Sequence, residues 1–590
     1  MNLASEVSTS TARLVALFLA LSFCAHAARA QSPTPKAAGK SGGVISGTVT
    51  AHGKGLADVT VALRPAGFGG QGQDLPQAKT DAEGKYSITD VPVGSYFVTP
   101  VAPVYVVPGA GRLTFSTDPV VITGGETIDG IDFSLVRGGV VTGKVVDAEG
   151  RPVVEQTVSL QNADQQPGGR GGFFGFGAGG GSARTDDRGV YRIYGIPAGS
   201  YYVSVGAQQR LTAYSTVMGQ QAYKQTFYPE ATDASQATVV AIAEGDEVGH
   251  IDITVGNTVE EYSVTGQVID KTSNMPVPNV GFTLSVLAGG GNRQRALGLM
   301  TLPVFSDAAG QFRVDNVPAG RYVVSLSPET SGGMSGQSAP FDVINQDVSG
   351  VVVQAVSGAG LSGAVTLEGA QDPTILSELL QFQVQVGVFG SGNASNAASV
   401  QTVPLNEDGS FQLSGLPAGT VRLALVAQDA TLQGAFKLLR TELNGVAQPR
   451  GIPVSTGQQL SGVRLVAAYA DGIVEGTVKL QNGALAPGAR LFARLAPAGQ
   501  QQGGRGAGLG AATVDSRGHF IIENVPAGSY NLIVSVFNPT GGQPARRGGG
   551  QRQQPPVSTQ QQVSVSEGQV STVNVALDLG QTQTPPPATP

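Results

Sequence analysis

The sequence predicts an all-β chain built as five tandem β-sandwiches. The 590 residues include 84 Gly and 35 Pro, and short Val/Ile/Leu runs lie between these turn residues, which favours strands over amphipathic helices. An apolar–Pro–small–Gly phrase also recurs five times, with its prolines at Pro92, Pro197, Pro318, Pro417 and Pro526. The spacing of roughly 100 to 120 residues is that of a whole domain, too long for a solenoid repeat.

The N-terminal segment has the pattern of a secretory signal peptide over residues 1–30. Arg13 precedes an apolar run over 14–23, and Ala28-Arg29-Ala30 forms a small-x-small cleavage site. We therefore expect an exported protein, periplasmic or extracellular at the cell surface. The single cysteine, Cys24, would leave with this segment, so the mature chain is expected to lack disulfides and thiolate ligands. No later run reaches 18 apolar residues, so no transmembrane span is predicted.

The repeats predict where the sandwiches lie along the chain. We expect a flexible linker over 31–42, sandwiches over 43–137, 138–258, 259–357, 358–468 and 469–580, and a disordered Pro-rich tail over 581–590. The linkers between sandwiches are short, which predicts a semi-rigid rod. The net charge of −7 makes nucleic acid an unfavourable partner, because binding to phosphates requires positive charge.

Two turn motifs and one strand motif recur in each unit. We call the D-x-x-G segments Asp-turns (81–84, 186–189, 307–310, 406–409 with Asn406 for Asp, and 515–518) and the apolar-Pro-small-Gly segments Pro-turns (91–94, 196–199, 317–320, 416–419 and 525–528). In each, the Gly is expected to take positive φ. About six residues separate the two turns, enough for one strand, so each pair predicts a three-stranded meander.

The strand motif is apolar-x-Gly-x-Val, which we call the glycine strand (45–49, 141–145, 264–268, 361–365 and 474–478). Large side chains stand two residues after each turn glycine and are expected in the core: Tyr86, Tyr191, Phe312, Phe411 and Phe520 after the Asp-turns, and Tyr96, Tyr201, Tyr322, Val421 and Tyr530 after the Pro-turns. A single meander buries too little surface, so each unit should close into two packed sheets.

These linked motifs resemble the carboxypeptidase regulatory-like domain, a transthyretin-like (prealbumin-like) member of the immunoglobulin-like sandwiches. The resemblance extends from about Gly43 to Leu579 and is weakest in the fourth unit, with Asn406 and Val421. It implies the sandwich fold and a non-catalytic role, because relatives are appendages of metallocarboxypeptidases, outer-membrane receptors and surface proteins. The wider group includes starch-binding-like modules, which implies sugar binding as an alternative.

The residue pattern offers little chemistry. His52, His250 and His519 fall in three different units without zinc-ligand spacing, and there is no G-x-S-x-G motif. One Asp for each Asp-turn is too few for calcium, which prefers six to eight oxygen ligands. We therefore predict no catalytic residue, no metal and no cofactor, and that the protein is not an enzyme.

Candidate ligand contacts lie in two places. Arg170, Phe173, Phe174 and Phe176 belong to a Gly-rich loop without a strand pattern, which is either a contact site or a spacer. An insertion in the second unit carries Tyr223, Phe227 and Tyr228, which either face a ligand or pack locally. Similar Gly/Arg/Gln loops precede the Asp-turns of other units and should leave equivalent ends of the sandwiches. They form either a polyvalent contact surface or solvent-exposed loops that tolerate changes in length.

The sequence therefore predicts an exported, non-catalytic structural or adhesive array at the bacterial envelope. Its expected partners are a polysaccharide, another cell-envelope polymer or an envelope protein. The alternatives are a carbohydrate-binding protein with a starch-binding-like fold, and an accessory or regulatory subunit of a separate hydrolase or carboxypeptidase.

Overall fold

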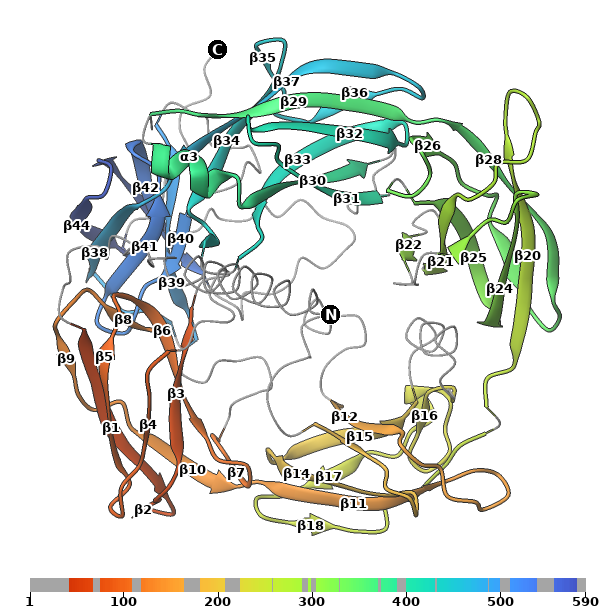
Figure 1. Cartoon of the computed structure of the whole chain (residues 1–590). Coiled ribbons are helices and arrows are strands. Elements are labelled where there is room, and N and C mark those ends of the chain that lie inside the picture. The colour runs from red at the N-terminus through yellow and green to blue at the C-terminus, as the bar shows by residue number, and fades with distance from the viewer. Residues whose placement is uncertain are drawn as a thin grey trace, which may run out of the picture.

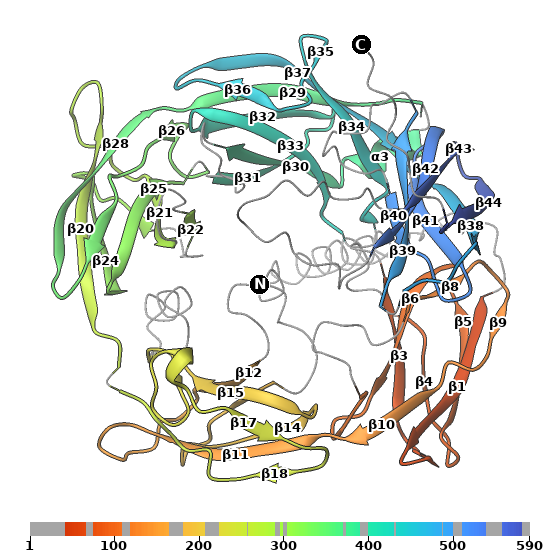
Figure 2. The ribbon, with the colours of Figure 1, turned by 180° about the vertical axis from the view of Figure 1, so that it is seen from behind.

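Two sheets face each other in each of five sandwiches, which follow one another around a ring in the computed structural model (Figures 1 and 2). The structure describes residues 42–66, 75–108, 118–163, 181–206, 223–256, 258–288, 295–298, 304–327, 329–369, 373–389, 399–429, 432–486, 488–498, 510–537 and 557–580. The helices in these ranges are one short α-helix, α3 (Pro373–Leu379), and one 3-10 turn, η2 (Ala234–Gln236). The prediction of an all-β chain is confirmed. No helix in these ranges has the length and apolarity needed to cross a bilayer.

The first sandwich shows the common design. Sheet I contains the glycine strand and comprises β1 (Gly43–Ala51), β2 (Lys54–Gly55), β5 (Lys85–Val91), β7 (Tyr105–Val106), β9 (Thr127–Ile128) and β10 (Phe133–Arg137). Sheet II comprises β3 (Thr60–Pro65), β4 (Gln77–Lys79), β6 (Gly94–Val101) and β8 (Val120–Ile122), in the order β4-β3-β6-β8. β1 pairs antiparallel with β5 and parallel with β10, whereas the pairs of sheet II are antiparallel.

The second and third sandwiches repeat this plan. In the second, sheet I holds β11 (Gly139–Val146), β14 (Val190–Ile196), β18 (Glu247–Val248) and β19 (Ile253–Thr254), and sheet II holds β12 (Thr157–Asn162), β13 (Ser182–Arg184), β15 (Gly199–Val205), β16 (Thr226–Phe227) and β17 (Val240–Ile242). In the third, sheet I holds β20 (Glu261–Asp270), β24 (Gln311–Pro318), β26 (Met334–Ser335) and β28 (Val348–Ser357), and sheet II holds β21 (Gly281–Ala288), β22 (Arg295–Gly298), β23 (Val304–Phe305), β25 (Gly320–Leu326) and β27 (Phe341–Val343).

The fourth and fifth sandwiches have longer strands. In the fourth, sheet I holds β29 (Ala359–Leu367), β32 (Ser410–Leu416), β34 (Phe436–Leu443), β35 (Val446–Ala447) and β37 (Gln459–Tyr469), and sheet II holds β30 (Phe382–Phe389), β31 (Ser399–Pro404), β33 (Gly419–Ala427) and β36 (Ile452–Val454). In the fifth, sheet I holds β38 (Gly472–Gln481), β41 (His519–Val525) and β44 (Val570–Asp578), and sheet II holds β39 (Arg490–Pro497), β40 (Gly510–Thr513), β42 (Gly528–Phe537) and β43 (Ser558–Val565).

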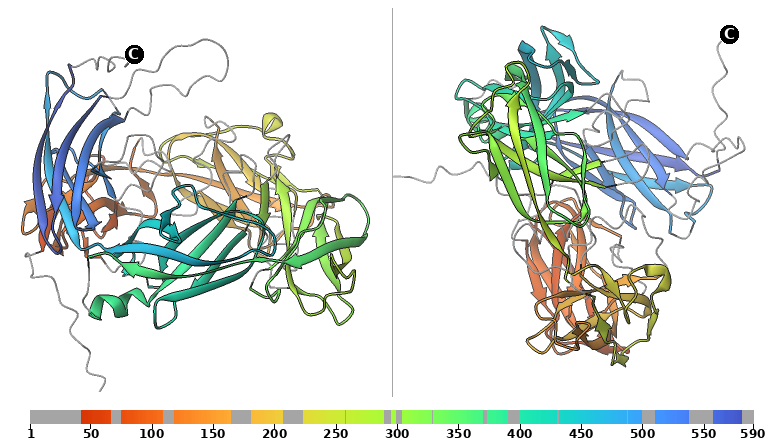
Figure 3. Two further views of the ribbon diagram at one scale, coloured as in Figure 1. Left: turned by 90° about the horizontal axis from the view of Figure 1, so that it is seen from above. Right: turned by 90° about the vertical axis from the view of Figure 1, so that its right-hand side faces the viewer.

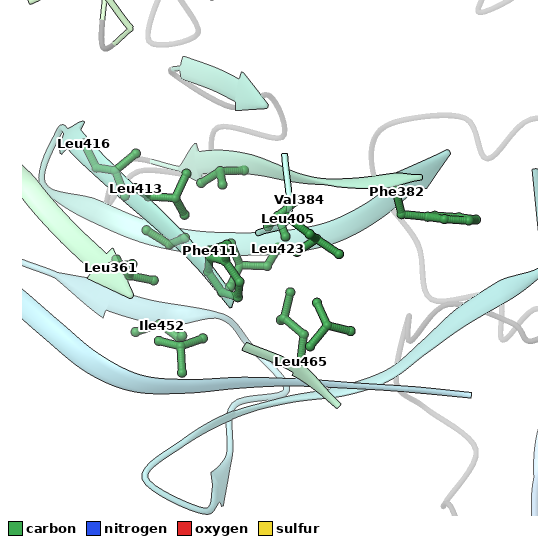
Figure 4. Packing of buried hydrophobic residues seen from close by; sticks show 14 of the residues in the cluster. Leu361, Phe382, Val384, Leu405, Phe411, Leu413, Leu416, Leu423, Ile452 and Leu465 are labelled. Atoms are coloured by element: carbon green, nitrogen blue, oxygen red, sulfur yellow. The ribbon is translucent and has the colours of Figure 1, made fainter. Parts of the chain in front are cut away.

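Each sandwich has its own apolar core between its sheets. Figure 4 shows the fourth, where Phe411 and Leu361 of sheet I meet Val384 and Leu423 of sheet II. The alternation along β30, whose Phe382, Val384, Val386 and Val388 are buried, is what a strand with one packed face requires. Burying one such side chain contributes roughly 1.5–3 kcal/mol. The large residues predicted after the turn glycines are all buried.

The predicted meander is wrong, because both turns carry the chain between sheets. In the first sandwich β4 and β6 each pair with β3 in sheet II, while β5, which lies between them in sequence, pairs with β1 in sheet I. The same exchange occurs in the other four. Turn residues show where a strand ends, but they do not show whether the next strand lies beside it or across the core.

The predicted positive φ of the turn glycines is confirmed for all five Asp-turns and for three of the five Pro-turns. Each Asp-turn Gly has positive φ, between 70° and 85°. In the Pro-turns Gly94, Gly419 and Gly528 have positive φ of 157° to 158°, outside the left-handed helical region, and Gly199 and Gly320 are not among the positive-φ glycines. The left-handed residue instead stands two positions before the proline, where Asp, Asn or Gly tolerates it: Asp90, Gly195, Asn316, Gly415 and Asn524.

The Pro-turn glycine has a steric purpose. A Cβ at Gly320 would lie 3.0 Å from the ring of Tyr322, which folds back over the turn. The Tyr322 hydroxyl donates a 2.8 Å hydrogen bond to the carbonyl oxygen of Pro318. Tyr201 and Tyr530 make the same bond to Pro197 and Pro526, also at 2.8 Å. The Pro-Ala-Gly-x-Tyr phrase is therefore one closed local structure.

The sandwiches form a ring rather than the predicted rod. In the second, third and fourth, sheet I lies on the outside of the ring and sheet II toward its centre (Figures 1 and 2). Successive sandwiches are joined by short backbone contacts, such as Gly138 N–H to the Val104 carbonyl and Gly358 N–H to the Gly333 carbonyl, both 2.9 Å. The fifth sandwich stands steeply against the fourth and returns to the first (Figure 3). These fixed contacts, which linker length does not reveal, curve the chain.

Candidate contact surfaces of the ring

The four predicted contact residues of the long Gly-rich loop lie outside the described residues. They are Arg170, Phe173, Phe174 and Phe176. The signal segment 1–30, residues 31–41 of the predicted linker 31–42 and the tail over 581–590 also lie outside. A ligand role of these four side chains stays a prediction.

The second candidate group, in the insertion of the second sandwich, is brought together by packing. Tyr223 is buried in the core, and Tyr228 packs against that core while remaining half-exposed. Phe227 is buried on the other face of sheet II, where its ring meets Tyr202 edge-to-face with centroids 6.2 Å apart. The structure thus shows local packing for Tyr223 and Phe227. A ligand contact of the group stays a prediction, with Tyr228 its most accessible member.

The strands next to the Gly-rich loops occupy one equivalent position. β4, β13, β22, β31 and β40 each follow such a loop in sequence, and the loops themselves lie mainly outside the described residues. Each of these strands lies at the edge of sheet II and pairs with the strand that precedes the loop, which is β3, β12, β21, β30 or β39. The segments between these paired strands therefore start and end at equivalent places in all five units.

The open face of sheet II in the fifth sandwich carries an aromatic pair that sequence reasoning missed. Phe492 and Phe537 meet edge-to-face at 5.8 Å, and Phe537 is 55% exposed. Arg494 lies on the same face of β39 and is exposed. The signal was present in the alternation of β39, because Leu491 and Leu495 face the core and Phe492 and Arg494 must then face away.

The fourth sandwich has a related arrangement. The Arg422 guanidinium lies 4.8 Å from the centre of the Phe389 ring, and both residues occupy the face of sheet II that points away from the core. A guanidinium over an aromatic face is held by the ring quadrupole and keeps its outward N–H groups available. Both faces therefore offer an aromatic surface beside an arginine.

The Asp-turn carboxylates serve the turns. Oδ1 of Asp186 accepts hydrogen bonds from the backbone N–H groups of Val190 and Arg188, at 2.8 and 2.9 Å. These bonds hold the pKa of Asp186 below its usual value. Asp81, Asp307 and Asp515 accept the same pair of bonds. In the fourth unit Asp408, rather than Asn406, accepts the bond from Ser410 N–H.

The histidines are dispersed. His52, His250 and His519 lie in the first, second and fifth sandwiches, and the first two occupy left-handed turn positions with φ of 50° and 60°. Across the described parts of the chain, no group of three or more His, Cys, Asp or Glu side chains is close enough to hold a metal ion.

Comparison of the sequence with protein families identifies one domain. Residues 140–230, within the second sandwich, match the model of the carboxypeptidase regulatory-like domain. Among curated proteins no sequence matches this chain significantly.

Comparison with solved structures finds multi-domain β-proteins. One is the Bacillus anthracis TIE protein, with 11% identity and a TM-score of 0.15 over 67% of this chain and 57% of that protein, so this chain spans just over half its length. Another is the shaft pilin SpaA from Lactobacillus rhamnosus GG, with 12% identity and a TM-score of 0.18 over 37% of this chain and 97% of the pilin. A third is GBS52, the minor pilin of Streptococcus agalactiae, with 14% identity and a TM-score of 0.21 over 37% and 95%. The low TM-scores mean that the whole chains do not superpose.

Proposed function

We propose that this chain is an exported, non-catalytic array that presents repeated contact surfaces at the bacterial envelope. The match of its second sandwich to the carboxypeptidase regulatory-like domain supports this proposal. The observation that carries this proposal is the repetition itself. Five sandwiches place the same edge strand of sheet II beside the same kind of Gly-rich segment. Weak contacts repeated on one scaffold add to a useful avidity. The signal-like pattern of residues 1–30 supports export.

The chemistry of the exposed faces favours an acidic polysaccharide as the ligand. Phe492 and Phe537 provide apolar ring surface, and Arg494 and Arg422 provide guanidinium groups beside aromatic rings. Sugar rings stack on aromatic faces, and guanidinium groups form charge-assisted, bidentate hydrogen bonds with carboxylates. A neutral glucan would use the rings alone, so it should bind more weakly.

Retention on immobilised alginate, compared with dextran, tests the ligand class. We expect the full chain to be retained on alginate, and the double variant Arg494→Gln, Phe537→Ser to lose at least about tenfold in affinity, because one charge-assisted bond and one stacking contact each contribute about 1 kcal/mol or more. Arg321→Gln is the matched control, since Arg321 is an exposed arginine on a different sandwich beside Asp342. Equal retention of both variants, or no retention of the unchanged chain, would contradict this ligand class.

Cell fractionation with cross-linking tests the location and the neighbour. The proposal expects the chain in the periplasm or at the cell surface, cross-linked to envelope material. Recovery with one stoichiometric hydrolase or carboxypeptidase would instead favour the accessory-subunit alternative. Recovery in the cytoplasm would contradict export.

A further inference from the structure

The fifth sandwich covers the free edge of a strand in the first. Among the described strands β8 pairs with β6 alone, so the backbone groups of Val121 on its other side need partners. Asp515, in the Asp-turn of the fifth sandwich, accepts a 3.4 Å hydrogen bond from the Val121 N–H. Arg517 of the same turn donates a 2.6 Å hydrogen bond to the Val121 carbonyl oxygen. The turn thus stands where a neighbouring strand would pair. We call this the ring-closing contact.

Apolar side chains complete the ring-closing contact. β41 of the fifth sandwich packs against β6 and β8 of the first. Ile521 on β41, and Phe97 and Val121 on β6 and β8, all point away from the cores of their own sandwiches, yet they are only 3%, 8% and 0% exposed. Outward side chains this deeply buried mark an interface between the two sandwiches rather than two independent surfaces.

At the positions of Ile521 and Val121, the other sandwiches show that burial is specific to the contact. The strand positions equivalent to Ile521, as fixed by pairing with the glycine strands, carry exposed residues in the other units: Ser87, Arg192, Arg313 and Gln412. The positions equivalent to Val121 are also exposed: Ala241, Asp342, Pro453 and Ser564. Only at the two ends of the array are these positions buried, and these two ends meet.

Charge complementarity supports the same interpretation. Arg517 lies 3.3 Å from Glu126 of the first sandwich, and Arg490 lies 3.7 Å from Asp118. The second sandwich provides a direct comparison, because Arg188 occupies the turn position of Arg517. Arg188 pairs with carboxylates of its own turn, and its side chain is 76% exposed against 34% for Arg517. The Asp515 side chain is 2% exposed and that of Asp186 is 39% exposed.

We propose that the first and fifth sandwiches carry a dedicated pair of docking surfaces that close the ring, and that the same pair joins separate copies of this chain head to tail when a ring is open. The two surfaces differ from each other, so the contact is heterologous. Within one chain the linkers hold them at an effective concentration of the order of 1 mM, which favours closure. The fifth sandwich of a second copy has the same surface as the chain's own fifth sandwich. It can therefore bind the first sandwich through the same residues.

Opening variants test the ring. Ile521→Arg introduces the residue that stands at the equivalent position of the second and third sandwiches, so the fifth should still fold. An arginine against the apolar surface of Phe97 and Val121 should lower the closed-to-open ratio at least about a hundredfold. Amide exchange of β8 should then accelerate, and small-angle scattering should show a longer maximum dimension. Gln412→Arg, the same change at an exposed equivalent site, is the control. An unchanged β8 and an unchanged dimension in Ile521→Arg would overturn closure.

Complementation tests the second copy. Val121→Lys disables the surface of the first sandwich, and edge strands tolerate lysine. Ile521→Arg disables only the surface of the fifth sandwich. In the mixture, the intact first sandwich of one variant can therefore bind the intact fifth sandwich of the other. The two altered surfaces both carry an introduced positive charge, so they should repel each other. We expect each variant alone to sediment as an open monomer and their mixture to form a one-to-one dimer near 100 μM, on the order of a tenth of the effective concentration. A mixture that stays monomeric, although both variants are open, would overturn the head-to-tail contact.

Discussion

A methyl group added to the glycine strand should lower the melting temperature of one sandwich and leave the other four unchanged. In Gly143→Ala, the new Cβ would lie 2.0 Å from the carbonyl oxygen of Ile251 and 2.9 Å from the Tyr191 hydroxyl oxygen. Ordinary contacts begin near 3.4 Å. The segment carrying Ile251 must therefore move by more than 1 Å, and it is held there by a hydrogen bond from Ile251 N–H to the Thr142 carbonyl and by the Tyr191 hydroxyl.

The cost follows from what this displacement breaks. Two hydrogen bonds of about 0.5–1.5 kcal/mol each are lost, and overpacking a close backbone contact costs a further 1–3 kcal/mol or so. A total of about 2–6 kcal/mol lowers the melting temperature of a domain of this size by at least about 8 °C, and by much more at the upper end.

Amide exchange of the full chain during a thermal ramp provides the assay, because it reports each sandwich separately. Peptides from β11 and β14 should lose protection early, while those of the other sandwiches melt as before. Gly249→Ala is the matched control in the same sandwich, where a Cβ would meet only the Thr142 hydroxyl at 3.5 Å. If Gly143→Ala melts within about 2 °C of the unchanged chain, the close approach is not what requires glycine.

Three further outcomes are expected. Tyr322→Phe should lower the free energy of unfolding of the third sandwich by about 1 kcal/mol, measured by denaturant-dependent amide exchange, because the buried hydrogen bond to Pro318 is lost. An unchanged free energy of unfolding would mean that this bond does not stabilise the sandwich. Asp307→Ala should destabilise the same sandwich by about 1 kcal/mol, since two backbone N–H groups lose their acceptor, whereas equal stability would show that water replaces the carboxylate. Acid should loosen the ring: although partial burial opposes its ionisation, hydrogen bonds from Thr123 and the Arg517 guanidinium hold the pKa of Glu126 below 4.5. The contribution of Glu126 is therefore present above pH 4.5 and lost as pH falls through the lowered pKa, and scattering that shows no expansion on acidification would contradict it.

Much of the geometry of the candidate contact surfaces could not be predicted from the sequence. The alternation of β39 does place Phe492 and Arg494 outside the core, but it cannot show that Phe537, distant in sequence, completes an aromatic pair. Tyr223 and Phe227 look alike in sequence, yet Tyr223 packs in the core and Phe227, on β16 at the edge of β15, packs on the other face of sheet II.

The repeats alone determined the fold class and the buried positions. Period-two alternation and turn chemistry act locally, so Tyr191 and Phe312 could be assigned to the core, and Asp186 and Gly189 to a turn, without coordinates. Only the tertiary structure decided that consecutive strands cross between sheets, that Gly143 is required by the Ile251 carbonyl rather than by its own backbone, and that β41 packs against β6 and β8. These features depend on which segments face each other across separations from tens to hundreds of residues, and local propensity carries no information about such pairings.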